Sequence, residues 1–175
     1  GDHRRGMLVV LSQAGARGLL GEIRKLLLSG EAKGEARVAL GHALINTGDD
    51  REIQLVLELD PPSPALLQSL ANRERPKLEL GDLLQPLLER DHFETKVAAM
   101  GLVERWEVKE LRDHAQELAQ AKGTADALRI AAIRAVGSLE GPNANDILVA
   151  VASDDASKFQ ISAVIAMIKG DPSQA

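Results

Sequence analysis

The sequence contains no cysteine and almost no aromatic residues. Without a thiol the chain can form no disulfide, no thiolate zinc site and no iron–sulfur cluster, and it has no cysteine nucleophile. Trp106, Phe93 and Phe159 are the only ring residues besides four histidines. A hydrophobic core must therefore consist mainly of Leu, Ile, Val and Ala, a composition that favours closely packed helices.

Long apolar runs are missing as well. No segment approaches 18 uninterrupted apolar residues, so we expect no transmembrane helix. The residues after Gly1 include no apolar region of the kind that a signal peptide needs. The sequence thus predicts a soluble chain and assigns it to no compartment.

Basic residues are outnumbered by acidic ones, 21 to 26, which gives a net charge of −5. General affinity for nucleic acids requires a basic face, so this balance argues against it. Hydrophobic residues make up 45% of the chain and charged residues 27%, which is typical of a folded domain. We expect residues 1–175 to form a single domain, and Gly1 in place of an initiator methionine suggests a fragment of a longer protein.

Glycines and prolines punctuate the sequence at short intervals, and the stretches between them carry apolar residues at helical spacing. No run alternates as a half-buried strand would. The predicted helices lie at 4–14, 18–28, 34–47, 51–59, 63–72, 79–89, 92–105, 108–122, 124–139, 143–152 and 155–169. Short connections between them favour antiparallel neighbours.

Several helix ends carry a local signal. Ser63 before Pro64 is typical of an N-cap with proline at the first helical position, and Thr124 is a second candidate N-cap. Pro86 falls inside a predicted helix, which should start late or kink there. The acidic pairs at 49–50 and 154–155 precede predicted helices, where a carboxylate caps free N–H groups. We favour this interpretation over general acid–base chemistry or cation binding.

A short pattern recurs along the chain: a long polar residue, a β-branched residue, a small residue and an apolar residue. It begins at Arg37, Lys96, Arg129 and Gln160, at separations of 59, 33 and 31 residues, with a weaker copy at 64–67. A period near 30 with two helices per unit is the signature of a solenoid. Each helix pair would then bury its apolar face against the next pair.

The run from Leu128 to Pro142 resembles the second helix of a HEAT repeat and its link to the next unit. The similarity extends over 92–170, is weaker over 34–60, and is poor at 61–90 and before residue 18. Gln160 replaces the arginine usual in that family. The resemblance implies an all-α HEAT-like α-solenoid of about five antiparallel helix pairs, and a compact multi-helix bundle is the alternative fold. It implies little about function.

No catalytic residue, cofactor site or metal site is predicted. The histidines have no partner at the spacing of metal ligands, and Gly15, Gly18 and Gly21 match no phosphate-binding loop. We interpret Trp106 as a packing residue between adjacent helices rather than an interaction anchor. The four histidines are His3, His42, His92 and His114.

The long cations Arg37, Lys96 and Arg129 recur at one position of the repeat. They could form a ladder for an acidic partner, but in the HEAT family this position ties neighbouring units together, and we favour the structural role. The concave surface of a solenoid comes from the second helix of each unit. The residues predicted there are mildly basic and would suit an acidic peptide or protein. They are His42, Arg105, Arg134, Ser138 and Lys169.

The sequence accordingly favours a non-catalytic module for protein–protein interaction or scaffolding, such as one segment of a large bacterial multidomain protein. The alternative is a HEAT-like enzyme or nucleic-acid-binding domain, of the type that excises DNA bases or acts on bilins. That alternative would need a cationic groove and stacking aromatic residues. We therefore expect no nucleic-acid partner.

Overall fold

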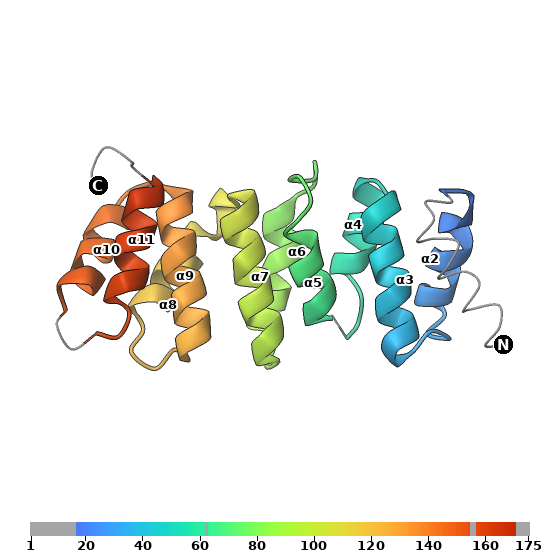
Figure 1. Ribbon diagram of the computed structural model, residues 1–175, viewed down its shortest axis with the longest axis horizontal. Helices are drawn as coiled ribbons and strands as arrows, with labels where there is room; N and C mark the ends of the chain where they lie inside the picture. Colours follow the sequence, from blue (N-terminus) through green and yellow to red (C-terminus); the bar gives the residue numbers. More distant parts are fainter. Residues whose placement is uncertain (1–16, 62, 155–156, 171–175) are drawn as a thin grey trace. The chain divides into compact units, whose positions relative to one another are not determined.

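The computed structural model describes residues 17–61, 63–154 and 157–170, and all regular structure in these ranges is helical (Figure 1). Ten α-helices and two 3-10 helices follow one another without a strand in this part of the chain. The 3-10 helices are η1 (Arg17–Leu19) and η2 (Lys109–Leu111). The α-helices are α2 (Leu20–Leu28), α3 (Gly34–Thr47), α4 (Asp50–Leu57), α5 (Pro64–Leu70), α6 (Leu80–Glu89), α7 (Phe93–Trp106), α8 (Arg112–Gln120), α9 (Asp126–Leu139), α10 (Ala144–Ser153) and α11 (Gln160–Gly170).

The all-α prediction is confirmed, and the helices predicted between residues 18 and 169 are all present. The bounds of α3 agree with the predicted range 34–47. The predicted helix at 4–14 lies outside the described residues. No helix in the described part of the chain has the length and apolar character needed to cross a membrane.

Two predicted helix starts are wrong, and the prediction of Ser63 as an N-cap is confirmed. Thr124 does not cap α9, because the N-cap is Ala125 and the Thr124 N–H donates to the Ala121 carbonyl in the preceding turn. α11 begins at Gln160 rather than at 155, since Ser157 first makes a turn in which its N–H donates to Asp154. Ser63 is the N-cap of α5, with Pro64 after it, although its side chain makes no capping bond.

Pro86 does not delay α6, which begins at Leu80 and runs through the proline. A proline here removes the N–H that would bond to the carbonyl of Asp82. Both residues are exposed, so water can hydrate the carbonyl that loses its partner. The apolar face of α6 stays buried through Leu84, Leu87 and Leu88.

By its internal contacts the chain divides into two compact units, an N-terminal unit (residues 1–78) and a C-terminal unit (residues 79–175). In the N-terminal unit, α3 packs against α2, α4 and α5. Its core is aliphatic, as the composition predicts: the fully buried side chains include Ile23, Leu40, Leu44, Leu66, Leu67 and Leu70.

The C-terminal unit is built as two layers of helices (Figure 1). The second helix of each successive pair packs on the next, α7 on α9 and α9 on α11, while α8 and α10 pack behind them. Trp106, the largest side chain, is 2% exposed at the end of α7, which confirms that it packs inside the protein. Each helix of this unit therefore packs mainly against helices one or two places away in the chain.

The α9–α11 contact is unusually close at Gly137. A Cβ atom added there would lie 2.6 Å from the backbone oxygen of Ala166, and one added at Gly170 would lie 2.7 Å from the backbone oxygen of Gly137. Two backbones meet at this point, so a side chain cannot be accommodated by a rotamer change. By contrast, a Cβ at Gly101 in α7 would meet no atom within 4 Å.

Gly137 in α9 and Gly101 in α7 form a matched pair for a stability measurement. Gly137→Ala should lower the free energy of unfolding by about 1–3 kcal/mol, because α9 and α11 must separate. Gly101→Ala should raise it by about 0.4–1 kcal/mol, because alanine reduces the entropy of the unfolded chain. Urea denaturation followed by circular dichroism measures both. A stabilised Gly137→Ala variant would show that the helices are not in close contact.

Candidate functional site

Four of the five residues predicted to form the partner-binding surface lie in the C-terminal unit, on the second helices. Arg105 is exposed in the last turn of α7, Arg134 is exposed on α9, and Ser138 is half-buried one turn later. Lys169 lies in the last turn of α11. His42 lies half-buried on α3 in the N-terminal unit.

Arg134 and Lys169 are brought together by an acid that the sequence analysis did not single out, Glu104 on α7. Arg134 Nε lies 3.1 Å from Glu104 Oε2 and 3.2 Å from Oε1, and Lys169 Nζ lies 3.4 Å from Oε1. The Glu104 side chain is 11% exposed, whereas the two cations are about half exposed. One carboxylate is thus shared by two cations from the next two second helices, and we call these three residues the Glu104 cluster.

A hollow of about 340 Å³ adjoins this cluster. Lys169 belongs to both, and Ser138 contributes a hydroxyl group to the wall. The charged residues that line it are two acids, Glu107 and Glu140, and two cations, Lys109 and Lys169. The residues that line the hollow can therefore hydrogen-bond a polar group of a ligand. The adjoining Glu104 cluster contains two cations and one acid.

The recurring cations behave as structural residues where the structure shows their contacts. Arg129 Nε donates to the carbonyl of Ala119 at 2.8 Å, and its guanidinium lies 4.6 Å from the centre of the Phe159 ring. Arg129 therefore ties α9 to α8 and to the residue before α11, through a carbonyl and a ring rather than an acid. Arg37 and Lys96 are half-buried at the equivalent positions.

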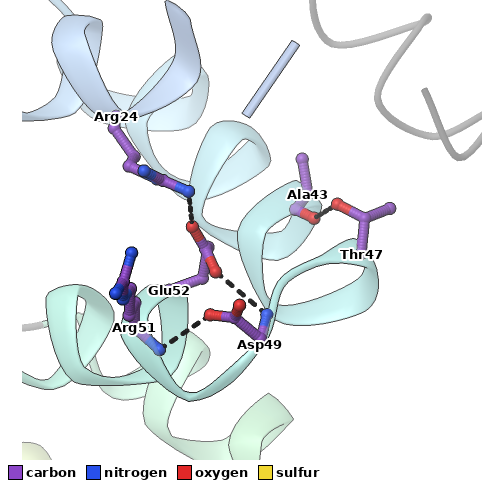
Figure 2. Close-up of polar contacts among 6 residues, drawn as sticks. All are labelled: Arg24, Ala43, Thr47, Asp49, Arg51 and Glu52. Atoms are coloured by element: carbon purple, nitrogen blue, oxygen red, sulfur yellow. Dashed lines mark hydrogen bonds and ion pairs between the residues drawn. The ribbon is translucent and has the colours of Figure 1, made fainter. Parts of the chain in front are cut away.

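A second polar group lies in the N-terminal unit (Figure 2). Glu52 on α4 is 1% exposed and forms an ion pair with Arg24 on α2, whose side chain is 40% exposed. The same carboxylate accepts a hydrogen bond of 2.9 Å from the Asp49 backbone N–H, while Asp49 accepts one of 2.9 Å from the Arg51 N–H. This reciprocal arrangement is a capping box. Glu52 thus holds the start of α4 and joins it to α2.

The capping interpretation is confirmed for Asp49 of the first acidic pair. Asp49 is the N-cap of α4, and Asp50 accepts a hydrogen bond of 3.1 Å from the Lys77 N–H. Asp154 is the C-cap of α10 rather than an N-cap, because α11 begins six residues later, and Asp155 lies outside the described residues.

The electrostatic surroundings lower the pKa of Asp49 below its ordinary value of 3.8. The neighbouring Glu52 side chain is the largest cause, followed by the Arg51 backbone N–H. The pKa of Asp49 is lower in the folded chain than in the unfolded chain, so ionised Asp49 stabilises the fold. This contribution to stability is complete above the unfolded pKa. It is lost as the pH falls through the folded pKa.

Acid should therefore destabilise the wild-type chain through Asp49, and Asp49→Asn provides the control. Asparagine keeps the capping acceptor but does not titrate in this range. Between about pH 5 and about pH 3, the melting temperature should fall further for the wild type than for Asp49→Asn. Thermal melts by circular dichroism at both pH values measure the difference. Equal decreases would contradict the assignment of this pH dependence to Asp49.

A larger hollow, of about 770 Å³, lies between the start of α4 and the segment after α5. Arg73, which lines the hollow, donates through Nη2 to the Gly48 carbonyl at 3.3 Å and so ties the segment after α5 to the residues just before α4. Acids and bases are mixed along its lining, so it offers no surface of one charge. The charged lining residues are Asp49, Asp50, Arg51, Arg73, Glu74, Arg75 and Lys77.

The described residues hold no group of three or more His, Asp or Glu side chains arranged to bind a metal ion. His92 is instead the N-cap of α7, where its Nδ1 accepts from the Thr95 N–H at 3.3 Å.

No protein-family model matches the sequence, and neither a curated protein nor a solved structure is significantly similar to the chain.

Proposed function

We propose that this chain is a non-catalytic binding or scaffolding module with the architecture of a HEAT-like α-solenoid. Five consecutive helix pairs, α2/α3 to α10/α11, support this proposal, together with the repeated sequence pattern at Arg37, Lys96 and Arg129. The ordered packing of α7, α9 and α11 gives a continuous row of second helices, as a solenoid uses for binding.

The Glu104 cluster is the observation that supports an acidic protein or peptide partner best. Arg134 and Lys169 each share Glu104, so the cluster carries one more positive than negative charge. A carboxylate of the partner would bind both cations and compete with Glu104 for them. The adjoining hollow would take the polar groups of the same segment, with Ser138 as a hydrogen-bonding residue.

The aromatic residues favour this proposal over the nucleic-acid alternative. Base stacking needs exposed rings. Trp106 is 2% exposed, and Phe159 is buried beneath Arg129. Phe93 is partly exposed, but it begins α7 and so lies at the opposite end of this helix from Glu104.

Two variants of the cluster should change binding in opposite directions. The probe is an array of acidic peptides, and the strongest binder is then measured by fluorescence anisotropy. Arg134→Gln with Lys169→Gln should weaken binding by about tenfold, equivalent to about 1.4 kcal/mol. Glu104→Gln should strengthen it by about threefold or more, because the competing carboxylate is gone.

The matched control replaces Lys25 and Lys122, both exposed and remote from Glu104 in the sequence, by glutamine. It changes the net charge by the same amount and should leave the dissociation constant within about twofold of the wild type. Failure of every acidic peptide to bind would refute an acidic partner. Equal weakening by the control would show that net charge, and not the Glu104 cluster, attracts the peptide.

A further inference from the structure

A second hollow, of about 360 Å³, adjoins the one beside the Glu104 cluster. We call the one beside the cluster the polar hollow and the second one the apolar hollow. The apolar hollow lies where α9 ends, α10 begins and α11 has its last turns. Val136, Leu148 and Ala166 in its wall are no more than 3% exposed. Its other apolar side chains are Ala144 and Met167, and its polar side chains are Glu140 and Asn145.

The two hollows share three lining residues, Gly137, Glu140 and Gly170. The backbones of the two glycines meet, since a Cβ atom on Gly170 would lie 2.7 Å from the backbone oxygen of Gly137. No side chain at these two positions therefore separates the hollows. Lys169 precedes Gly170, lines the polar hollow and lies 3.4 Å from Glu104. A ligand that extends from Lys169 past the two glycines thus enters the apolar hollow.

The third shared residue determines which part of a ligand can occupy the apolar hollow. Among the described residues that line this hollow, only Glu140 is charged. A ligand carboxylate there would be repelled by Glu140 and would lose water against apolar side chains. The cations Lys109 and Lys169 line the polar hollow instead. The two hollows therefore suit a ligand whose acidic group lies at the cations and whose uncharged apolar group lies beyond Glu140.

We propose that the apolar hollow binds one large apolar side chain, such as leucine, methionine or phenylalanine, of an acidic peptide whose carboxylate binds Arg134 and Lys169. This inference rests on the proposed function and adds a sequence requirement to it. The apolar residue of the partner lies within about three residues of the acid, because the hollows adjoin and an extended peptide advances by about 3.3 Å per residue. Asn145 can hydrogen-bond the backbone of the bound peptide.

The strongest binder among the acidic peptides provides the probe. Each position within three residues of an acid is replaced in turn by leucine and by alanine, and binding to the whole chain is measured by fluorescence anisotropy. At one position the leucine peptide should bind at least about fivefold more tightly than the alanine peptide, because the leucine side chain leaves water in the apolar hollow.

Met167→Asp should abolish this preference. The substitution places a charge in the wall of the apolar hollow, so the leucine and alanine peptides should then bind within about twofold of each other. Met167 is half-buried, and circular dichroism checks that the variant is folded. Val149→Asp is the matched control, because Val149 on α10 is 43% exposed and lines neither hollow. It changes the net charge equally and should keep the fivefold preference.

Glu140→Gln tests the charge of the apolar hollow without changing a buried residue, since Glu140 is exposed. A peptide with glutamate in place of the preferred leucine should bind this variant about threefold more tightly than it binds the wild type, because the repelling carboxylate is gone. The affinity of the leucine peptide should change less. An equal gain for both peptides would show that Glu140 does not select the side chain in the apolar hollow.

The possible failures are distinguishable. Acidic peptides that bind through Arg134 and Lys169 without preferring leucine at any position would overturn this inference and leave the proposed function standing. A leucine preference that persists in Met167→Asp would also overturn it, because the side chain would then bind elsewhere. Failure of every acidic peptide to bind would overturn the inference together with the acidic partner on which it rests.

Discussion

Replacing Trp106 by alanine is expected to lower the free energy of unfolding by about 3–5 kcal/mol. Trp106 is 2% exposed and is the only tryptophan, in a chain with only two other Phe, Trp or Tyr residues. The aliphatic core around it cannot fill the volume of an indole ring, so the substitution leaves a cavity as well as removing buried apolar surface.

Urea denaturation followed by circular dichroism measures this loss, since the substitution removes the tryptophan fluorescence. Trp106→Phe keeps much of the ring and should lose markedly less stability. Hydrogen exchange should locate the loss of protection in α7 to α9 rather than in α2 to α5. A Trp106→Ala variant as stable as the wild type would contradict the buried position of this side chain.

The second large effect is expected at Arg24. Arg24→Met leaves the Glu52 carboxylate, which is 1% exposed, without its cationic partner. Removing one partner of a fully buried ion pair lowers the free energy of unfolding by about 3–5 kcal/mol. Because Arg24 is partly exposed, water weakens this pair, and we expect a loss of about 2–3 kcal/mol. The free energy of unfolding from urea denaturation tests the prediction.

The double variant Arg24→Met/Glu52→Gln separates the charge from the cap. Glutamine can still accept the hydrogen bond from the Asp49 N–H, but it leaves no buried charge. Most of the stability lost in Arg24→Met should therefore return. If the double variant is no more stable than Arg24→Met, the unpaired charge of Glu52 is not the cause of the loss.

The sequence predicted the helices well because their signals are local. α3 carries glycines at residue 34 and just after its end at residue 48, and its predicted bounds agree with the structure. The start of α11 depends instead on a turn in which the Ser157 N–H donates to the Asp154 carbonyl. Thr124 lies in the turn that follows α8, so it precedes the N-cap of α9, Ala125, by one residue. Neither arrangement follows from helical periodicity, because turns and loops rather than apolar spacing determine them.

The partner-binding surface stays a prediction. Arg134 and Lys169 lie on the successive second helices α9 and α11, and the structure brings both to Glu104. Glu104 was missed because its repeat equivalents are Gly137 and Ile168, so no pattern points to an acid there. The Arg24–Glu52 pair was also missed, because no repeated pattern points to it. The capping box could have been predicted, since an acid lies three residues after Asp49.

The Glu104 cluster also bears on how the C-terminal unit loses its structure. In a stack stabilised only between nearest neighbours, the terminal helix pair can fray alone while the pairs before it stay folded. The contact between Lys169 and Glu104 spans 65 residues and passes over α9. Detachment of α11 would therefore also leave a charge on α7 with one partner fewer, which couples the last helix of the row to its first and makes unfolding more cooperative.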